Sequence, residues 1–494
     1  MNDSELFCHD LITTPDRQIE KILVTGATGY IGGRLVPELV ARGYNVRVMV
    51  RKNEPEYEKR WPESEIVVAD ALKYNTLKKT MEGVHTAYYL IHSMLFGRKE
   101  LETKEIRAAS NFIRAAEENG VKRIIYLGGL GDINTSLSRH LKSRMKVAEI
   151  FMNSRVPATI LRAAIIIGSG SASYELIKSL VNNLPFLFLP HWAKTECQPI
   201  GIRDVVKYLV GVLEVPEAAG NMYDIGGDDI LSYESMLKIL ADILGKRQLL
   251  IPSPVSWIAP YAYIANLFTP VPGPIILSLL ESIKNEVICQ NNDIKRLLPF
   301  RPLGYKESIV RAMTRDEQDN IHTRWSDSYP PAHSLAIKLH ELESPPRYYS
   351  YYQITTDKQP STLFRAVCKI GGKEGWFNNN WMWRFRGMLD RLLMGVGTAR
   401  GRRNSSDLRI NDVIDFWRVE DLKPDKRILL RAEMKLPGRA WLEFVIDKGK
   451  ERNMLSVNAF YQSKGFWGNI YWYIFLPFHH IIFNDLIKQI EARA

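Results

Sequence analysis

Short apolar runs alternate with longer stretches of helical periodicity through the first part of the chain. A short apolar run bounded by turn residues is typical of a buried β-strand, and apolar positions three and four apart are typical of an amphipathic helix. Alternation of the two predicts an α/β fold with a doubly wound parallel sheet, which binds ligands at the carboxyl ends of its strands. The predicted strands are 22–24, 45–50, 65–69, 84–91, 121–127 and 159–167, and the predicted helices include 30–42, 99–119 and 137–153.

A glycine-rich turn joins the first predicted strand to the first predicted helix. Residues 21–33 read KILVTGATGYIGG, so that Gly26, Gly29 and Gly32 fall between the strand and the helix. A diphosphate can approach backbone that carries no Cβ atoms, and the N–H groups of a helix N-terminus favour its negative charge. Because a second strand follows at the expected distance, the turn predicts a dinucleotide-binding site.

The spacing G-x-x-G-x-x-G after Thr25 resembles the short-chain dehydrogenase/reductase superfamily, especially its extended and atypical branches. The resemblance continues through residues 198–200 (QPI), 203–206 (RDVV) and 222–227, and so covers residues 20–315. It implies a Rossmann-type NAD(P)-binding domain with residues 184–197 on the substrate side. The cofactor-binding residues that it implies are Thr25, Gly26, Thr28, Gly29, Tyr30, Ile31, Gly32, Arg51, Lys52, Asp70, Ala71, Leu90 and Gly128.

The residues after the second strand bear on which nucleotide is bound. An NAD-preferring site normally has an acid there to bind the ribose hydroxyls, whereas this chain has Arg51 and Lys52. Two cations and no acid favour the 2′-phosphate of NADP(H) over NAD(H). Arg34 is either a further cation of this pocket or a surface residue. Asp70, after the third strand, is expected to contact the adenine, to cap the following helix, or to do both.

The expected catalytic positions depart from the superfamily pattern. The fifth strand ends in GGLG, residues 128–131, in place of the serine that polarises a carbonyl. Counting back from the next strand puts His140 in the tyrosine position and Arg144 in the lysine position of the Tyr-x-x-x-Lys pair. The tyrosine normally delivers a proton while the lysine lowers its pKa and holds the nicotinamide ribose. His140 is therefore a candidate proton donor or an exposed helix histidine, and Arg144 is a candidate ribose ligand.

One long stretch of this part of the chain is uncharged. No charged residue lies between Arg247 and Glu281, and six prolines interrupt the stretch. Such proline density is a poor fit to a membrane-spanning helix. The stretch is predicted to be an apolar lid over a hydrophobic substrate, a patch that touches a membrane or partner, or ordinary core.

The remaining chain divides into a lead-in, a linker and a second domain. Residues 1–19 contain no signal-peptide core and are read as a flexible lead-in, and residues 316–346 mix charges, aromatics and prolines as a linker does. Residues 347–494 combine a strand, two helices, alternating strands at 428–436, 440–446 and 455–461, and a helix at 469–492 interrupted by Pro477. This order resembles the helix-grip fold of the START and polyketide-cyclase-like superfamily, an α+β fold with an antiparallel sheet.

The helix-grip resemblance implies an apolar cavity beneath the last helix. Candidates to line it, with ordinary core packing as the alternative, are Trp417, Trp441, Phe444, Phe460 and Trp472. Three arginines in a glycine-flanked stretch (Arg400, Arg402 and Arg403) are either a head-group site or part of a surface loop. His479 and His480 lack further ligands at metal-binding spacing, so no metal site is predicted.

Charge and cysteine content refine these expectations. The net charge is +11, and residues 346–494 hold 25 Lys and Arg against 15 Asp and Glu. A basic C-terminal part favours an anionic ligand, an acidic partner or an anionic membrane surface, against the simpler alternative of a solvated basic face. The sequence shows no nucleic-acid recognition motif, so we expect no nucleic-acid partner. Four widely separated cysteines favour a reducing cytoplasm, and we expect any membrane contact on the inner face.

The leading prediction is an NADP(H)-binding oxidoreductase of the atypical short-chain type that acts on an apolar small molecule, such as a quinone, isoprenoid or lipid-like carbonyl. The alternative is a redox-inactive NADP(H)-binding structural or sensor protein with a C-terminal hydrophobic-ligand or membrane-surface domain. The absence of the usual serine, tyrosine and lysine supports the alternative. The sequence predicts no particular oligomeric state.

Overall fold

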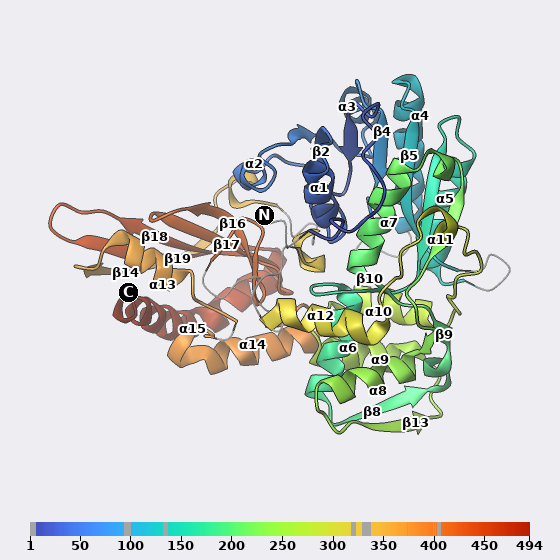
Figure 1. The fold of residues 1–494 in the computed structure, drawn as a ribbon. Coiled ribbons are helices and arrows are strands. Elements are labelled where there is room, and N and C mark those ends of the chain that lie inside the picture. Colours follow the sequence, from blue (N-terminus) through green and yellow to red (C-terminus); the bar gives the residue numbers. More distant parts are fainter. Residues whose placement is uncertain are drawn as a thin grey trace. The chain divides into compact units, whose positions relative to one another are not determined.

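The computed structural model describes residues 6–92, 100–131, 137–317, 323–328, 337–372, 374–398, 400, 402 and 407–494 (Figure 1). The chain forms two compact units. Met1–Ala262 and Pro274–Tyr329 make up the first, and Tyr263–Gly273 and Pro330–Ala494 make up the second. The stretch Tyr263–Gly273, which the sequence analysis assigned to the nucleotide-binding domain, therefore belongs to the second unit. The boundaries placed at residues 315 and 346 remain predictions.

The first unit is built on a seven-stranded parallel sheet with the strand order β11-β6-β5-β4-β1-β2-β3. Each paired neighbour runs parallel, and the order reverses direction beside β1, as in a doubly wound sheet. The predicted α/β fold is thus confirmed. The strands are β1 Ile22–Val24, β2 Val46–Val50, β3 Glu65–Val68, β4 Thr86–Tyr89, β5 Arg123–Gly129, β6 Ala158–Ala163 and β11 Met222–Ile225.

Helices cover both faces of this sheet. Val24 packs in a core with one helical layer, whereas the adjacent Leu23 packs in a core with the other, because successive side chains of a strand point to opposite faces. Burial on both faces explains why these strands read as continuous apolar runs. The helices of the two layers are α1 Gly32–Ala41 and α7 Ile202–Glu214 on one side, and α3 Tyr74–Thr80, α4 Glu100–Glu118 and α5 Arg139–Met152 on the other, with α2 Pro55–Arg60 following β2.

The rest of the first unit adds a smaller layer beyond the carboxyl ends of the strands. A third apolar core joins α6, α8 and α12 to short strand pairs. The additional strands are β7 Ile166–Ile167, β8 Phe186–Pro190, β9 Glu196–Cys197, β10 Ile200–Gly201, β12 Leu231–Ser232 and β13 Leu249–Ser253. The additional helices are α6 Ala172–Asn183, α8 Tyr233–Ile243, α9 Ile258–Phe268, α10 Gly273–Ile283, α11 Ile294–Leu297 and α12 Tyr305–Glu317, of which α9 begins in the first unit and ends in the second.

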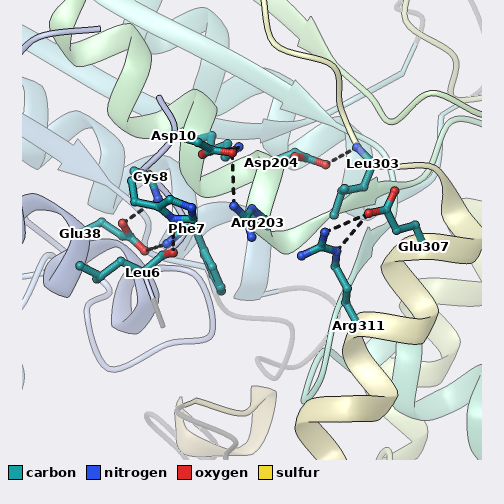
Figure 2. Close-up of polar contacts among 12 residues, drawn as sticks. Leu6, Phe7, Cys8, Asp10, Glu38, Arg203, Asp204, Leu303, Glu307 and Arg311 are labelled. Atoms are coloured by element: carbon teal, nitrogen blue, oxygen red, sulfur yellow. Dashed lines mark hydrogen bonds and ion pairs between the residues drawn. The ribbon is translucent and has the colours of Figure 1, made fainter. Parts of the chain in front are cut away.

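The N-terminal segment corrects the expectation of a flexible lead-in. Phe7, Cys8 and Leu11 are buried against the first core. The carboxylate of Glu38 accepts the backbone N–H groups of Phe7 at 2.5 Å and Cys8 at 3.1 Å, and Asp10 pairs with Arg203 at 3.3 Å (Figure 2). Residues 6–19 are packed because buried helix carboxylates and apolar side chains hold them. Residues 1–5 lie outside the described part of the chain.

One segment of the predicted linker is packed. Thr323 is fully buried in the first unit, where its hydroxyl donates to the Tyr30 carbonyl at 3.0 Å. The N–H of Trp325 donates to the Gly170 carbonyl at 2.9 Å. Residues 323–328 therefore contribute to the nucleotide-binding unit.

The second unit contains a six-stranded antiparallel sheet with the order β14-β19-β18-β17-β16-β15. The long helix α15 packs on β14 and β19, where Trp472 stacks on Tyr461 with ring centroids 5.8 Å apart. An antiparallel α+β unit is confirmed, whereas the helix-grip assignment stays a prediction. The elements are β14 Tyr348–Thr356, α13 Pro360–Val367, α14 Asn380–Leu392, β15 Val413–Ile414, β16 Trp417–Lys423, β17 Arg427–Ala432, β18 Gly438–Asp447, β19 Asn453–Ser463 and α15 Gly465–Ala492.

Two local predictions for the second unit were wrong. The last helix is not interrupted at Pro477: α15 runs through the proline, which is exposed. The strand predicted to reach residue 436 ends at Ala432. Glu433, which follows the strand, is buried because it is paired with arginines, whereas Lys435 is exposed.

A buried ion cluster surrounds that glutamate. Glu433, with no exposed side-chain area, pairs with Arg400 and Arg418, and Arg431 lies 3.7 Å away. Burial acts to raise the pKa of Glu433, but the three guanidinium groups outweigh it and lower that pKa. Arg400 is therefore neither a head-group ligand nor a surface-loop residue. Arg402 donates to the Ile370 carbonyl at 2.6 Å, and Arg403 lies outside the described residues.

Candidate cofactor and catalytic site

The glycine turn has the close backbone approach that its spacing predicts. Gly26 follows β1 with φ +67°, in the left-handed region that favours glycine. A Cβ atom at this position would lie 2.4 Å from the Leu90 carbonyl oxygen, which comes directly after β4. A Cβ at Gly32, the first residue of α1, would lie 2.5 Å from the Gly26 carbonyl oxygen. Only glycine permits these two contacts.

The start of α1 fits a diphosphate. No side chain caps this helix at Ile31, and its first turn contains no acidic residue. A Cβ built on Gly29, between Gly26 and Gly32, would meet just one atom within 4 Å, the Gly26 carbonyl oxygen at 3.1 Å. The turn thus combines glycine backbone with an uncapped helix N-terminus, the combination that binds phosphate. The turn would hold the diphosphate of a dinucleotide through residues Gly26 to Gly32, which include Thr28, Tyr30 and Ile31.

Two residues near the turn have structural roles. The Thr25 hydroxyl donates to the Tyr88 carbonyl at 2.9 Å and so ties β1 to β4. Arg34 is buried and donates to the carbonyls of Thr323 and Ser169, both at 2.9 Å. Both alternatives for Arg34, a pocket cation and a surface residue, are therefore wrong, because its guanidinium is committed to backbone oxygens that lie far away in the sequence.

The predicted ribose and adenine residues lie at neighbouring strand ends. Arg51 and Lys52 follow β2 and are exposed, and Asp70 and Ala71 follow β3. The ends of these two strands adjoin, because Val50 of β2 pairs with Val68 of β3. Asp70 accepts the Leu72 N–H at 3.0 Å, so it orders the turn before α3 without capping that helix.

The last two predicted cofactor residues are backbone positions of the central strands. Leu90 is half-buried after β4, and its N–H donates to the Thr25 hydroxyl at 3.3 Å. Gly128 lies within β5, where an added Cβ would come within 3.2 Å of the Tyr126 ring. Leu90 therefore borders the glycine turn directly.

A cluster of titratable side chains lies just beyond the same strand ends. The Ser138 hydroxyl accepts the Leu141 N–H at 3.3 Å and so starts α5, which puts His140 in its first turn. His140 is half-buried, and its ring centroid lies 4.9 Å from that of His92, three residues after β4. His92 Nδ1 lies 3.2 Å from a Glu105 carboxylate oxygen of α4, whose other oxygen accepts the Ser143 hydroxyl.

Burial and neighbouring charges set the protonation of this cluster. Burial, His92 and Arg144 together hold the pKa of His140 well below its ordinary value, and burial and Arg144 lower the pKa of His92. Burial alone would raise the pKa of Glu105, but the His92 and Ser143 hydrogen bonds and the Arg144 charge hold it at about 2. At neutral pH the cluster therefore contains two neutral imidazoles and an ionised carboxylate. His92 then carries its proton on Nδ1, and its buried Nε2 meets no hydrogen-bond partner among the described residues.

Arg144 lies one helical turn after His140, as the predicted spacing requires. Its guanidinium donates to the Leu127 carbonyl of β5 and lies 5.4 Å from the Tyr126 ring centroid. It is therefore engaged with the end of β5 and acts on the two histidines through its charge.

Sequence reasoning missed the other three members of the cluster. His92 stands at a strand end, the place where catalytic residues gather, and that position was the available signal for it. Ser143 lies three residues after His140, a spacing that puts the two on one face of α5. Glu105 lies inside a long polar helix, where no pattern distinguishes it. The described residues hold no group of three His, Cys, Asp or Glu side chains arranged to bind a metal ion.

Comparison with known proteins agrees with this geometry. Residues 26–182 match a family model described as NAD(P)H-binding, and residues 344–486 match a model described as a protein of unknown function, DUF2867. The first unit is therefore similar to NAD(P)H-binding domains, in agreement with the coarser part of the prediction.

Individual relatives are distant. The chain is 27% identical over 307 residues to the mitochondrial NADH dehydrogenase (ubiquinone) 1 alpha subcomplex subunit 9 of Arabidopsis thaliana, a match that covers 57% of this chain and 75% of that protein. It is 23% identical over 253 residues to the chloroplastic divinyl chlorophyllide a 8-vinyl-reductase of the same plant, covering 47% of this chain and 60% of the reductase. The structure of Bordetella bronchiseptica WbmG in complex with NAD matches with a TM-score of 0.50 at 13% identity, over 63% of this chain and 98% of WbmG, and this shows the shared fold.

Proposed function

We propose that the first unit is an NADP(H)-dependent oxidoreductase that acts on an apolar small molecule, such as a quinone, an isoprenoid or a lipid-like carbonyl. The observation that carries the proposal is the segment that follows β4. Its Leu90 carbonyl packs against Gly26 of the nucleotide-binding turn, and two residues later His92 meets Glu105 and His140. One short segment thus joins the expected cofactor site to a cluster of titratable groups, as a hydride-transfer site requires.

The chain's own residues would orient the substrate oxygen and support its protonation. When bound, NADPH supplies a hydride, which is one proton with two electrons, and the reduced substrate oxygen then needs one further proton. His140, held neutral by its lowered pKa, would donate an N–H hydrogen bond to that oxygen, and the proton would come from water. Glu105 would hold His92 in one tautomer through Nδ1, so that the Nε2 acceptor stays beside His140.

The preference for NADP(H) rests on Arg51 and Lys52 after β2. A guanidinium can bind the 2′-phosphate with two charge-assisted hydrogen bonds, whereas no acid follows β2 directly to accept from a free ribose hydroxyl. The apolar substrate class rests on the uncharged stretch of residues 248–280. Its exposed side chains in the first unit include Leu249, Val255 and Trp257.

A redox-inactive protein that binds NADP(H) as a structural element or signal is the second candidate. It is favoured by the Arg144 guanidinium, which donates to the Leu127 carbonyl, and by the absence of the tyrosine and lysine of the superfamily pattern. In that case the second unit would carry the activity by binding a hydrophobic ligand or a membrane surface.

Titration with NADPH and NADH, followed by nicotinamide fluorescence, tests the cofactor. We expect wild type to bind NADPH more tightly than NADH. Loss of one charge-assisted phosphate contact in Arg51→Ala should weaken NADPH binding by about 10- to 100-fold and leave NADH nearly unchanged. Lys79→Ala removes an exposed cation from α3 and serves as the matched control. Failure of folded protein to bind either nucleotide would refute the proposal.

NADPH oxidation in the presence of short-chain quinones tests the chemistry. Wild type should oxidise NADPH with a stoichiometry of one quinol formed per NADPH. His140→Ala should lower kcat by about 100-fold while the Kd for NADPH is unchanged, because His140 acts on the substrate oxygen. Tight NADPH binding without turnover on quinones, isoprenoid aldehydes and lipid-like ketones would favour the redox-inactive candidate.

A further inference from the structure

Two helices of the second unit carry an extended row of exposed apolar and aromatic side chains. We propose that this surface docks on an anionic lipid bilayer. On α14 the exposed apolar residues recur three, four and one apart, which places them on one side of the helix. We name this surface the aromatic face, and it consists of Trp381, Phe385, Met388, Leu392 and Leu393 of α14 with Phe466, Trp467, Tyr473, Ile474, Phe478 and Ile481 of α15.

The two helices that carry these rows pack against each other. Trp383 of α14 packs against Phe483 of α15 with ring centroids 6.3 Å apart, and Arg386 Nε donates to the Tyr471 hydroxyl at 3.4 Å. These contacts use sides of the helices other than those that carry the exposed rows, so the rows stay open to solvent. Figure 1 shows α14 and α15 side by side in the second unit.

The composition of α15 is that of an interfacial helix. Residues 465–484 contain no Asp, Glu, Lys or Arg, yet in this range Gly468, Trp472 and Phe483 alone are buried. A water-exposed helix of a soluble protein normally carries charges on its outer side, and this one carries Trp, Tyr, Phe and Ile. None of the described helices combines the length and apolar character needed to cross a membrane. Tryptophan and tyrosine concentrate at the level of lipid head groups, which fits a helix that lies on the bilayer.

Charge selects the bilayer over another apolar occupant. Arg384 lies within the α14 row and Lys464 directly precedes α15, and both are exposed. The one acid of α14, Asp390, is fully buried. Residues 346–494 carry 25 cations against 15 anions. An aromatic row bordered by cations and lacking exposed acids complements an anionic head-group layer, whereas in a self-associated pair the symmetric approach of these cations would be repulsive.

The size of the exposed side chains supports a measurable partition. Trp467, Phe466 and Tyr473 are 73%, 71% and 64% exposed. Large aromatic side chains each remove a substantial apolar area from water when they enter the head-group region. Patches of this kind on soluble domains commonly mark interaction sites.

Vesicle flotation of the full-length protein tests the proposal. Vesicles of phosphatidylcholine alone are compared with vesicles that contain phosphatidylglycerol, at low and high salt. We expect binding to the anionic vesicles that weakens with salt. The double variant Trp467→Ser/Ile474→Ser should reduce the partition coefficient by about 10- to 30-fold. Arg384→Gln should reduce it about fivefold at low salt, because one cation near the surface contributes about that factor.

The matched control is Ile12→Ser, which removes an apolar side chain that is 73% exposed in the first unit and should leave binding unchanged. Quenching of tryptophan fluorescence by brominated lipid in wild type is a second readout that needs no variant, and we expect it with anionic vesicles. Absence of both flotation and quenching overturns the proposal. Equal vesicle binding by wild type and the double variant also overturns it. So does a wild type that is dimeric and binds no vesicles while the double variant is monomeric, because the aromatic face would then contact a second copy of the chain.

Discussion

Replacement of Gly26 by alanine tests the central contact of the nucleotide-binding unit. At φ +67°, alanine adopts a left-handed conformation that costs about 1–2 kcal/mol. Its Cβ would also lie 2.4 Å from the Leu90 carbonyl oxygen, and relief of such an overlap by backbone shifts costs a further 1–3 kcal/mol, approximately. We therefore expect Gly26→Ala to lower the free energy of unfolding of this unit by about 2–5 kcal/mol.

Gly83→Ala separates the two contributions. Gly83 has φ +70°, but no atom lies within 4 Å of an added Cβ, so this variant should lose only the conformational part, about 1–2 kcal/mol. Both variants reduce the entropy of the unfolded chain equally, and that term cancels in the comparison. Urea unfolding followed by circular dichroism gives the free energies, and NADPH titration should show weaker binding for Gly26→Ala alone. Equal losses in the two variants would refute the close approach between the turn and Leu90.

Two further predictions concern buried carboxylates. Burial raises the pKa of Asp204 to about 6, so its native form holds a proton that the unfolded form releases between pH 4 and 6, and stability falls as pH rises through that range. Asp204→Asn keeps an acceptor for the Leu303 N–H, which lies 2.8 Å from the Asp204 carboxylate. In urea unfolding, we expect the free energy of unfolding of wild type, relative to this variant, to fall by about 3 kcal/mol from pH 4 to pH 7. A difference that does not change with pH would contradict the argument. Glu433→Gln should destabilise the second unit by about 3–5 kcal/mol at pH 7, because three guanidinium groups lose their buried anion. A thermal unfolding curve equal to that of wild type would show that the cluster is not needed for stability.

The parallel sheet was predictable because its signals are local. Ile22, Leu23 and Val24 are buried on both faces of one strand, and the glycines after them are required by contacts within the same turn. His140 was found by its spacing from the next strand. Glu105, which is hydrogen-bonded to His92, was not found, because that contact depends on which side of α4 faces the end of β4, and periodicity does not specify this for a single residue.

Buried charges were the main class of residue that sequence reasoning misplaced. An arginine is mostly exposed in folded proteins, so Arg34 and Arg400 were read as pocket or surface residues. Arg34 is buried because Thr323, 289 residues away, supplies a carbonyl acceptor, and Arg400 is buried because Glu433 supplies a carboxylate. Partners so distant in sequence leave no local pattern.

The second unit takes the stretch Tyr263–Gly273 from the middle of the sequence. Within that unit, the Asn266 side-chain amide donates to the Arg391 carbonyl at 3.0 Å, and the Tyr263 hydroxyl donates to the Leu392 carbonyl at 3.5 Å. The polypeptide accordingly passes between the units three times, at residues 262–263, 273–274 and 329–330. A fragment that begins at residue 347 would lack the donors that complete the end of α14. No single cut in the chain therefore separates the two units. Replacement of the second unit by recombination would also have to replace residues 263–273, which lie within the sequence of the first unit.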